Sequence, residues 1–222
     1  MLGEFSSDPI GVIFGLIALV TAITVHEFAH AWSADRLGYP TPRLMGRLTL
    51  NPLAHLDPIG TILMLLVRFG WGKPVQFDPY NLRHPKRDSA LISLAGPASN
   101  LALATLSSIF LRMLFSLTLP SYWIIGILDY LLIGLLQPLV VMNVILAVFN
   151  LVPIHPLDGF KIVGGLLPDE QSRQWSELER YGMIFLIVLI LPVGGGSSPI
   201  HQIISPVIST LLRLLLPSVG FI

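Results

Sequence analysis

Long apolar runs separated by short polar stretches dominate the sequence. Three of them, at about 9–34, 89–119 and 122–149, exceed the roughly 20 residues that cross a bilayer as a helix. Two shorter runs follow at about 181–193 and 200–216, with the turn sequence GGGSSP between them. The run that begins at residue 59 is apolar for only about nine residues before Arg68. A full crossing needs roughly 17 residues, so we expect 59–70 to be a re-entrant or half-depth segment.

The composition supports a membrane protein. Of the 222 residues, 53% are hydrophobic and 12% are charged, whereas a soluble domain is about 25% charged. We therefore predict an all-α polytopic membrane protein with about five to six transmembrane helices, embedded in the lipid bilayer. It should form one domain over residues 1–222, with a core at about 10–165 and accessory C-terminal spans at about 181–216. The net charge of zero gives no sign of nucleic-acid binding, and the lack of cysteine excludes Cys-ligated zinc.

Two polar stretches have the look of short strands. The sequence RLMGRLTL at 43–50 alternates loosely between polar and apolar residues, and 74–77 is a second candidate. Together they predict a small β-hairpin beside the re-entrant segment.

The basic residues predict the orientation. Eight of the thirteen lysines and arginines lie between the first apolar run and the run at 89–119. Because cytoplasmic loops carry the excess of basic residues, residues 35–88 should be cytoplasmic. The chain would then be a multi-pass protein of the cell membrane with its N-terminus outside and its C-terminus inside. The segment PLDG, at 156–159, would also lie at the cytoplasmic end of its span.

The sequence HEFAH interrupts the first apolar run. It contains His26, Glu27 and His30 in the pattern H-E-x-x-H. On a helix the two histidines share one face and can bind the same zinc ion, while the glutamate can act as general base. Ionisable residues at membrane depth are costly, which makes the motif more specific here than in a soluble helix.

A catalytic zinc site usually has a third protein ligand and an open position. Asp158 should lie near the cytoplasmic end of its span, at the depth predicted for His26 and His30. We therefore predict one zinc ion per chain, bound by His26, His30 and Asp158. An N-cap role for Asp158 is the alternative. His55 is a possible extra ligand that we interpret as a loop histidine.

The sequence resembles the site-2 proteases, a family of zinc intramembrane metalloproteases. HEFAH, GYPTPRLMGRLTLNPLAHLDPIGT, AGPASN and FNLVPIHPLDG occur in the family's order, over residues of about 10–165. The resemblance implies that His26, His30 and Asp158 are zinc ligands and that Glu27 is the catalytic base. It also implies a compact form without a PDZ domain or a C-terminal regulatory domain. Members cleave transmembrane segments of other proteins. His155 departs from the proline or apolar residue of many relatives.

The reaction also needs donors for the oxyanion and an accessible peptide bond. Asn100 and Asn150 are the candidate donors, with Asn150 favoured because it is close to Asp158 in the chain. The substrate, a transmembrane protein, must unwind locally, and an exposed strand edge at 43–50 or 74–77 could hold it.

Two other functions fit part of the pattern. A proton-coupled transporter could use a relay of histidine and carboxylate groups. An inactive relative could bind membrane proteins, although it would have no use for Glu27.

Overall fold

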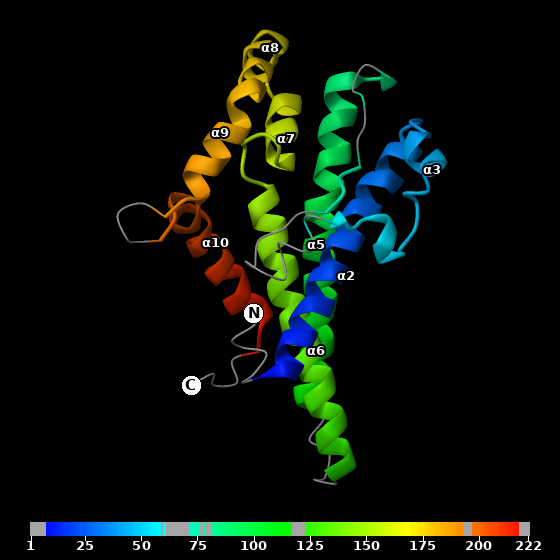
Figure 1. Ribbon diagram of the computed structural model, residues 1–222, viewed down its shortest axis with the longest axis vertical. Coiled ribbons are helices and arrows are strands. Elements are labelled where there is room, and N and C mark those ends of the chain that lie inside the picture. Colours follow the sequence, from blue (N-terminus) through cyan, green and yellow to red (C-terminus); the bar gives the residue numbers. More distant parts are fainter. Residues whose placement is uncertain are drawn as a thin grey trace.

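The computed structural model describes residues 8–58, 60, 72–75, 78, 81–116, 123–192 and 197–217. Three long helices form its centre: α2 (Pro9–Arg36), α5 (Pro85–Ser116) and α6 (Trp123–Asn150). They pack side by side (Figure 1). Each is long and apolar enough to cross a membrane. The chain is therefore a membrane protein with three candidate spanning helices.

Helix α2 begins as the sequence predicts. Asp8 is its N-cap, and the Asp8 carboxylate accepts a hydrogen bond of 2.9 Å from the Gly11 backbone N–H. Pro9 follows in the first turn, where its missing N–H costs nothing. Downstream, small residues face the bundle, and Ala18, Ala22, Ala31 and Ala34 are fully buried. Small side chains let helix backbones approach closely in a membrane.

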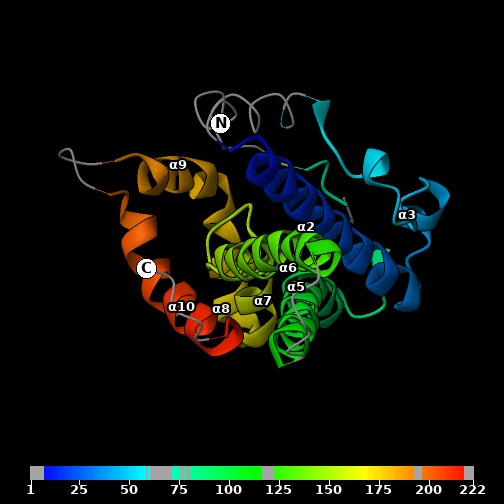
Figure 2. The same ribbon diagram turned by 90° about the horizontal axis from the view of Figure 1, so that it is seen from below.

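Four shorter helices follow α6. These are α7 (Asp158–Leu166), α8 (Asp169–Glu177), α9 (Glu179–Ile190) and α10 (Pro199–Leu215). Figure 1 shows α7 and α8 at the upper end of the bundle, with α9 and α10 along one side of α6. A buried apolar cluster that includes Val144, Leu186 and Ile204 joins α6, α9 and α10. Seen from below, α10 stands beside α5 and α6 (Figure 2).

The last two helices are arranged differently from the two accessory spans that the sequence predicted at about 181–216. α9 starts beside His155, which a Cβ on Gly182 would meet. The C-terminal end of α10 lies beside the second half of α5, where Arg112 donates a hydrogen bond of 2.6 Å to the Leu214 carbonyl. The two helices therefore follow one another down the bundle (Figure 1). At 12 and 17 residues, neither is long enough to count as a candidate span by itself.

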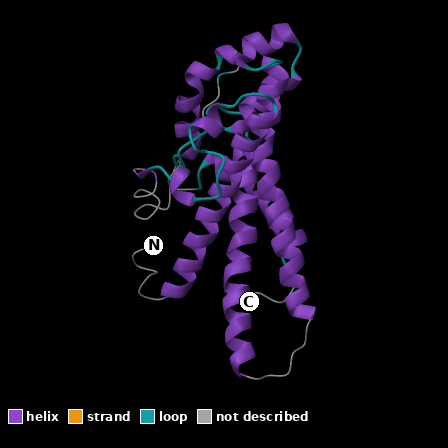
Figure 3. Ribbon diagram, turned by 90° about the vertical axis from the view of Figure 1, so that its right-hand side faces the viewer, coloured by secondary structure: helices purple, strands orange, loops and turns teal. Residues whose placement is uncertain are grey.

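The expected strand at 43–50 is wrong. Thr41–Leu44 form the short helix α3, and turns and bends follow, up to the 3-10 helix η1 at Pro52–Ala54. Proline at position 42 suits the first turn of a helix, and the loose alternation at 43–50 could not exclude this turn. Figure 3 shows helices and loops over the described residues.

The second strand candidate is only partly described. Pro74 and Val75 are not in a strand, and residues 76–77 lie outside the described residues. What the described residues contain is one isolated antiparallel bridge between Leu56 and Gly72. Most of the predicted re-entrant segment at 59–70 also lies outside them.

Candidate metal centre

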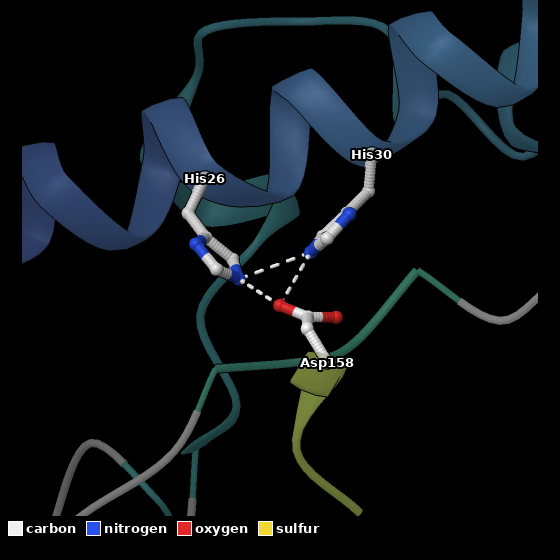
Figure 4. A group of neighbouring side chains, drawn as sticks. All are labelled: His26, His30 and Asp158. Carbon is white, nitrogen blue, oxygen red and sulfur yellow. Dashed lines mark hydrogen bonds and ion pairs between the residues drawn. The ribbon is translucent and has the colours of Figure 1, made fainter. Parts of the chain in front are cut away.

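The side chains of His26, His30 and Asp158 meet inside the bundle (Figure 4). One carboxylate oxygen of Asp158, Oδ2, lies 3.1 Å from His26 Nε2 and 3.3 Å from His30 Nε2. The two Nε2 atoms are 3.0 Å apart. Both histidines are buried, with exposed fractions of 5% and 6%. The residues predicted as metal ligands therefore form one compact group that could bind a metal ion.

Local structure explains why the three atoms converge. His26 and His30 lie one turn apart on α2, so their side chains project from the same face. Asp158 is the first residue of α7, and a Cβ on Gly159 would overlap the carbonyl oxygen of Leu151. Glycine at 159 thus lets α7 begin directly against the end of α6. The N-cap is Leu157, with no side-chain cap bond, so the structure shows no competing cap role for Asp158.

The donor atoms fit a zinc ion. Tetrahedral zinc with bonds of about 2.0–2.2 Å holds its ligand atoms about 3.3–3.5 Å apart, close to the spacing of these three atoms. Asp158 Oδ2 is buried, and no described residue donates a hydrogen bond to it. An orphaned carboxylate oxygen costs free energy unless a cation or a proton compensates it.

Helix α5 comes against the metal centre through the AGPASN segment. A Cβ on Gly96 would lie 2.5 Å from His30 Nε2 and 2.6 Å from His26 Cε1. No real Cβ atom approaches so closely, so only glycine lets α5 approach the two imidazoles. One turn earlier, the Ile92 carbonyl oxygen is 2.7 Å from His30 Nδ1. One turn later, Asn100 Oδ1 is 2.6 Å from His26 Nδ1.

Asn100 has no amide hydrogen left for an oxyanion. Its two N–H groups donate to the Ala22 carbonyl, at 3.0 Å, and to Asn143 Oδ1, at 2.7 Å. Asn150, the other predicted donor, ends α6 and donates to the Leu146 carbonyl at 2.9 Å. An oxyanion role for Asn150 stays a prediction. Sequence reasoning missed Asn143, although a buried amide in an apolar run is a signal of function at membrane depth.

Glu27 follows His26 on α2 and is half-buried. Its Oε2 atom accepts a hydrogen bond of 2.9 Å from the Val75 backbone N–H. The segment 72–75 reaches this position because Lys73 N–H donates to the His55 carbonyl at 2.7 Å, and because buried Arg47 donates to the carbonyls of Ala54 and Lys73. The candidate base, Glu27, therefore lies against the segment 72–75 and is hydrogen-bonded to it.

His55 belongs to the support of this segment. It is fully buried, and its Nε2–H donates to the Thr49 carbonyl at 2.7 Å. It is not part of the group formed by His26, His30 and Asp158, and this position is that of a loop histidine.

Comparison with known proteins defines the class. Residues 14–192 match Peptidase family M50, the site-2 proteases, and the chain belongs to this family. It is 37% identical over 183 residues to YwhC of Bacillus subtilis strain 168, covering 81% of each chain. It is 31% identical over 189 residues to Rip2 of Mycolicibacterium smegmatis, covering 82% of this chain and 68% of Rip2.

Rip2 of Mycobacterium tuberculosis H37Rv is also 31% identical, over 188 residues. Each of these relatives is designated a candidate zinc metalloprotease. No solved structure matches the chain. Family and relatives together identify the protein as a metalloprotease, which confirms the resemblance seen in the sequence.

Proposed function

We propose that the protein is an intramembrane zinc endopeptidase that hydrolyses peptide bonds in or near transmembrane segments of other membrane proteins. The observation that carries the proposal is the buried group of His26, His30 and Asp158, with Glu27 beside it on a helix long enough to span the bilayer. Such a group costs free energy inside the membrane, so its presence there indicates a function.

His26, His30 and Asp158 would hold the zinc ion. When bound, zinc supplies Lewis-acid activation of a water molecule and of the scissile carbonyl group. Glu27 would take the proton of that water on its carboxylate and deliver it to the leaving amide nitrogen. The hydrogen bond from the Val75 N–H to Oε2 orients the carboxylate for both transfers. Asn150 is the candidate donor for the oxyanion.

The substrate has to present an unwound peptide bond, because the amides of a membrane helix are already hydrogen-bonded. With 43–50 excluded as a strand, we propose that the segment 72–75 holds the substrate in extended form beside Glu27. Val75→Pro would remove the N–H that contacts Glu27. Cleavage should fall while the bound zinc is retained, whereas unchanged cleavage would exclude a role for the segment.

We also propose that the centre lies near the cytoplasmic side of the cell membrane. The C-terminal ends of α2 and α6, which lead to His30 and Asp158, are at the same end of the bundle as α3 and the start of α5, two described parts of the basic stretch (Figure 1). The positive-inside rule assigns such a stretch to the cytoplasm.

The activity can be tested without knowing the substrate. New protein N-termini in membranes of cells that express the wild type would be compared with those in cells that express Glu27→Gln. We expect wild-type-specific N-termini inside or beside transmembrane segments, and equal zinc content in the two purified proteins. Equal zinc without such N-termini would argue for an inactive relative. A wild type without zinc would instead favour the proton-coupled transporter.

A further inference from the structure

Asn143 is a polar side chain in the second half of α6, and it lies outside the group that would hold the metal. Its exposed fraction is 0%, as is that of Asn100. Its amide N–H donates to the Leu139 carbonyl at 2.8 Å, and its Oδ1 accepts from Asn100 at 2.7 Å. A chain of hydrogen bonds therefore runs from α6 through α5 to His26 on α2.

The two ends of this chain fix the orientation of both amides. The Leu139 carbonyl can only accept a hydrogen bond, so the amide nitrogen of Asn143 must face it and Oδ1 must face Asn100. The Ala22 carbonyl also only accepts, so the amide nitrogen of Asn100 faces both Ala22 and Asn143. Oδ1 of Asn100 is then the atom left to face His26.

This orientation selects one tautomer of His26. Because Asn100 Oδ1 is an acceptor, the proton of the neutral imidazole must be on Nδ1, at 2.6 Å. The lone pair is then on Nε2, the atom that faces His30 and Asp158. The opposite tautomer would put a proton where the metal has to bind.

We propose that Asn143 is a positioning residue of the metal centre, which acts through Asn100 to hold His26 in its metal-binding tautomer. The inference rests on the metal site of the proposed function, but it does not depend on which peptide bond is cleaved. Partners of this kind orient a ligand and typically change metal affinity 10- to 100-fold when they are removed.

Zinc affinity of the full-length protein in detergent, measured by competition with a chelator, tests the proposal. Asn143→Leu keeps the approximate size of the side chain and removes the acceptor for Asn100. Asn143→Asp keeps an oxygen acceptor and, when protonated, an O–H that can donate to the Leu139 carbonyl. We expect zinc affinity to fall about tenfold in Asn143→Leu and to stay within about threefold of the wild type in Asn143→Asp.

A purely structural role predicts a different result. The Asp variant places a more polar group in the bundle, so it should be the less stable of the two and would then lose more zinc than the Leu variant. Val144→Ala, at the neighbouring fully buried position of α6, is the matched control. It should lower the melting temperature and leave zinc affinity unchanged.

A double-mutant cycle tests whether Asn143 acts through Asn100. In an Asn100→Ala background, Asn143→Leu should cause no further loss of zinc affinity. Equal losses in the two backgrounds would overturn the proposal, as would a normal zinc affinity in Asn143→Leu. The visible spectrum of the cobalt-substituted protein gives a second readout, which should change in Asn143→Leu and not in Val144→Ala.

The same experiment separates this inference from the proposed function. A wild type that binds zinc but cleaves nothing would leave the Asn143 comparison intact. A wild type that binds no zinc would overturn both.

Discussion

At the scale of single residues, the candidate metal centre depends on three side chains that could bind the metal and on a glycine that leaves space for them. His26, His30 and Asp158 could supply three ligand atoms, which lie within 4.8 Å of one another. Gly96 supplies the space for them, because any side chain there would overlap the imidazoles. Single substitutions can test separately the need for the ligand atoms and the need for the space at Gly96.

Removal of the carboxylate should abolish the centre. Asp158→Ala leaves two imidazoles, fewer than the three protein ligands of a catalytic zinc site. We expect about one zinc per wild-type chain and a large loss of zinc in the variant, measured as metal content after purification. Asp169→Ala is the control, because Asp169 is exposed and pairs with Lys86 on the surface at 2.9 Å. Full zinc in Asp158→Ala would mean that another residue is the third ligand.

Gly96→Ala should damage the same centre by steric overlap. A Cβ within 2.5–2.6 Å of both imidazoles must displace them or α5. Overpacking of this kind costs about 1–3 kcal/mol, and we expect zinc affinity to fall as well. The matched control is Gly15→Ala in α2, where a Cβ would meet nothing within 4 Å. Thermal unfolding and zinc competition should show a loss of stability and of zinc affinity in Gly96→Ala and no loss of either in Gly15→Ala. Equal losses in the two variants would refute the steric argument.

At the scale of elements, the position of α7 decides whether Asp158 reaches the histidines. α7 packs against α5, where a Cβ on Gly165 would overlap Ala90. On the side of α8, the Trp175 ring stacks on Phe160 with centroids 5.1 Å apart, and its N–H donates to the Phe160 carbonyl at 2.9 Å. A short helix of nine residues is thus held between two neighbours.

Gly165→Val should therefore weaken zinc binding from a distance. The added side chain forces α7 away from α5, and Asp158 moves with the helix. We expect a stability loss of about 1–3 kcal/mol together with reduced zinc affinity. Leu166→Ala, at a position that is 79% exposed, is the control, and both of its values should be close to the wild type. Wild-type zinc affinity in Gly165→Val would show that α7 tolerates displacement.

At the scale of the whole molecule, the path of α9 and α10 bears on the topology. A helix of 12 residues is about 18 Å long, well short of a hydrocarbon core of about 30 Å. Because α10 continues in the direction of α9, we propose that the two together would make one broken crossing. With the basic stretch at 35–88 in the cytoplasm, the end of α10 would lie outside, on the side opposite to the one expected from the sequence.

Reporter fusions can decide between these two topologies. We expect alkaline phosphatase fused after residue 222 to be active, because this enzyme folds only outside the cytoplasm. A cysteine introduced at Leu53, which is 80% exposed, should react with an impermeant reagent only after the membrane is opened. The native chain has no cysteine to interfere. An inactive fusion with the same labelling would restore the C-terminus to the inside.

The sequence determined the class of protein, the three long helices and the three residues of the group that could bind a metal. Long apolar runs and the H-E-x-x-H spacing are local patterns, which can be recognised in the sequence without knowledge of the fold. Charge bias also placed Asp158 at the depth of His26 and His30, and the structure brings the three together.

Tertiary structure alone decided the rest. The packing of α2, α5 and α6 decides that Asn100 uses both amide hydrogens, that it is linked to Asn143 and that position 96 needs glycine. The sequence does not show these contacts, because the residues that pack together are distant along the chain. The same holds for α9 and α10, since a sequence shows the length of an apolar run and not the direction in which the next run continues. The sequence did not predict the helix at 41–44, because four residues are too few to show whether the apolar pattern has the period of a helix or of a strand.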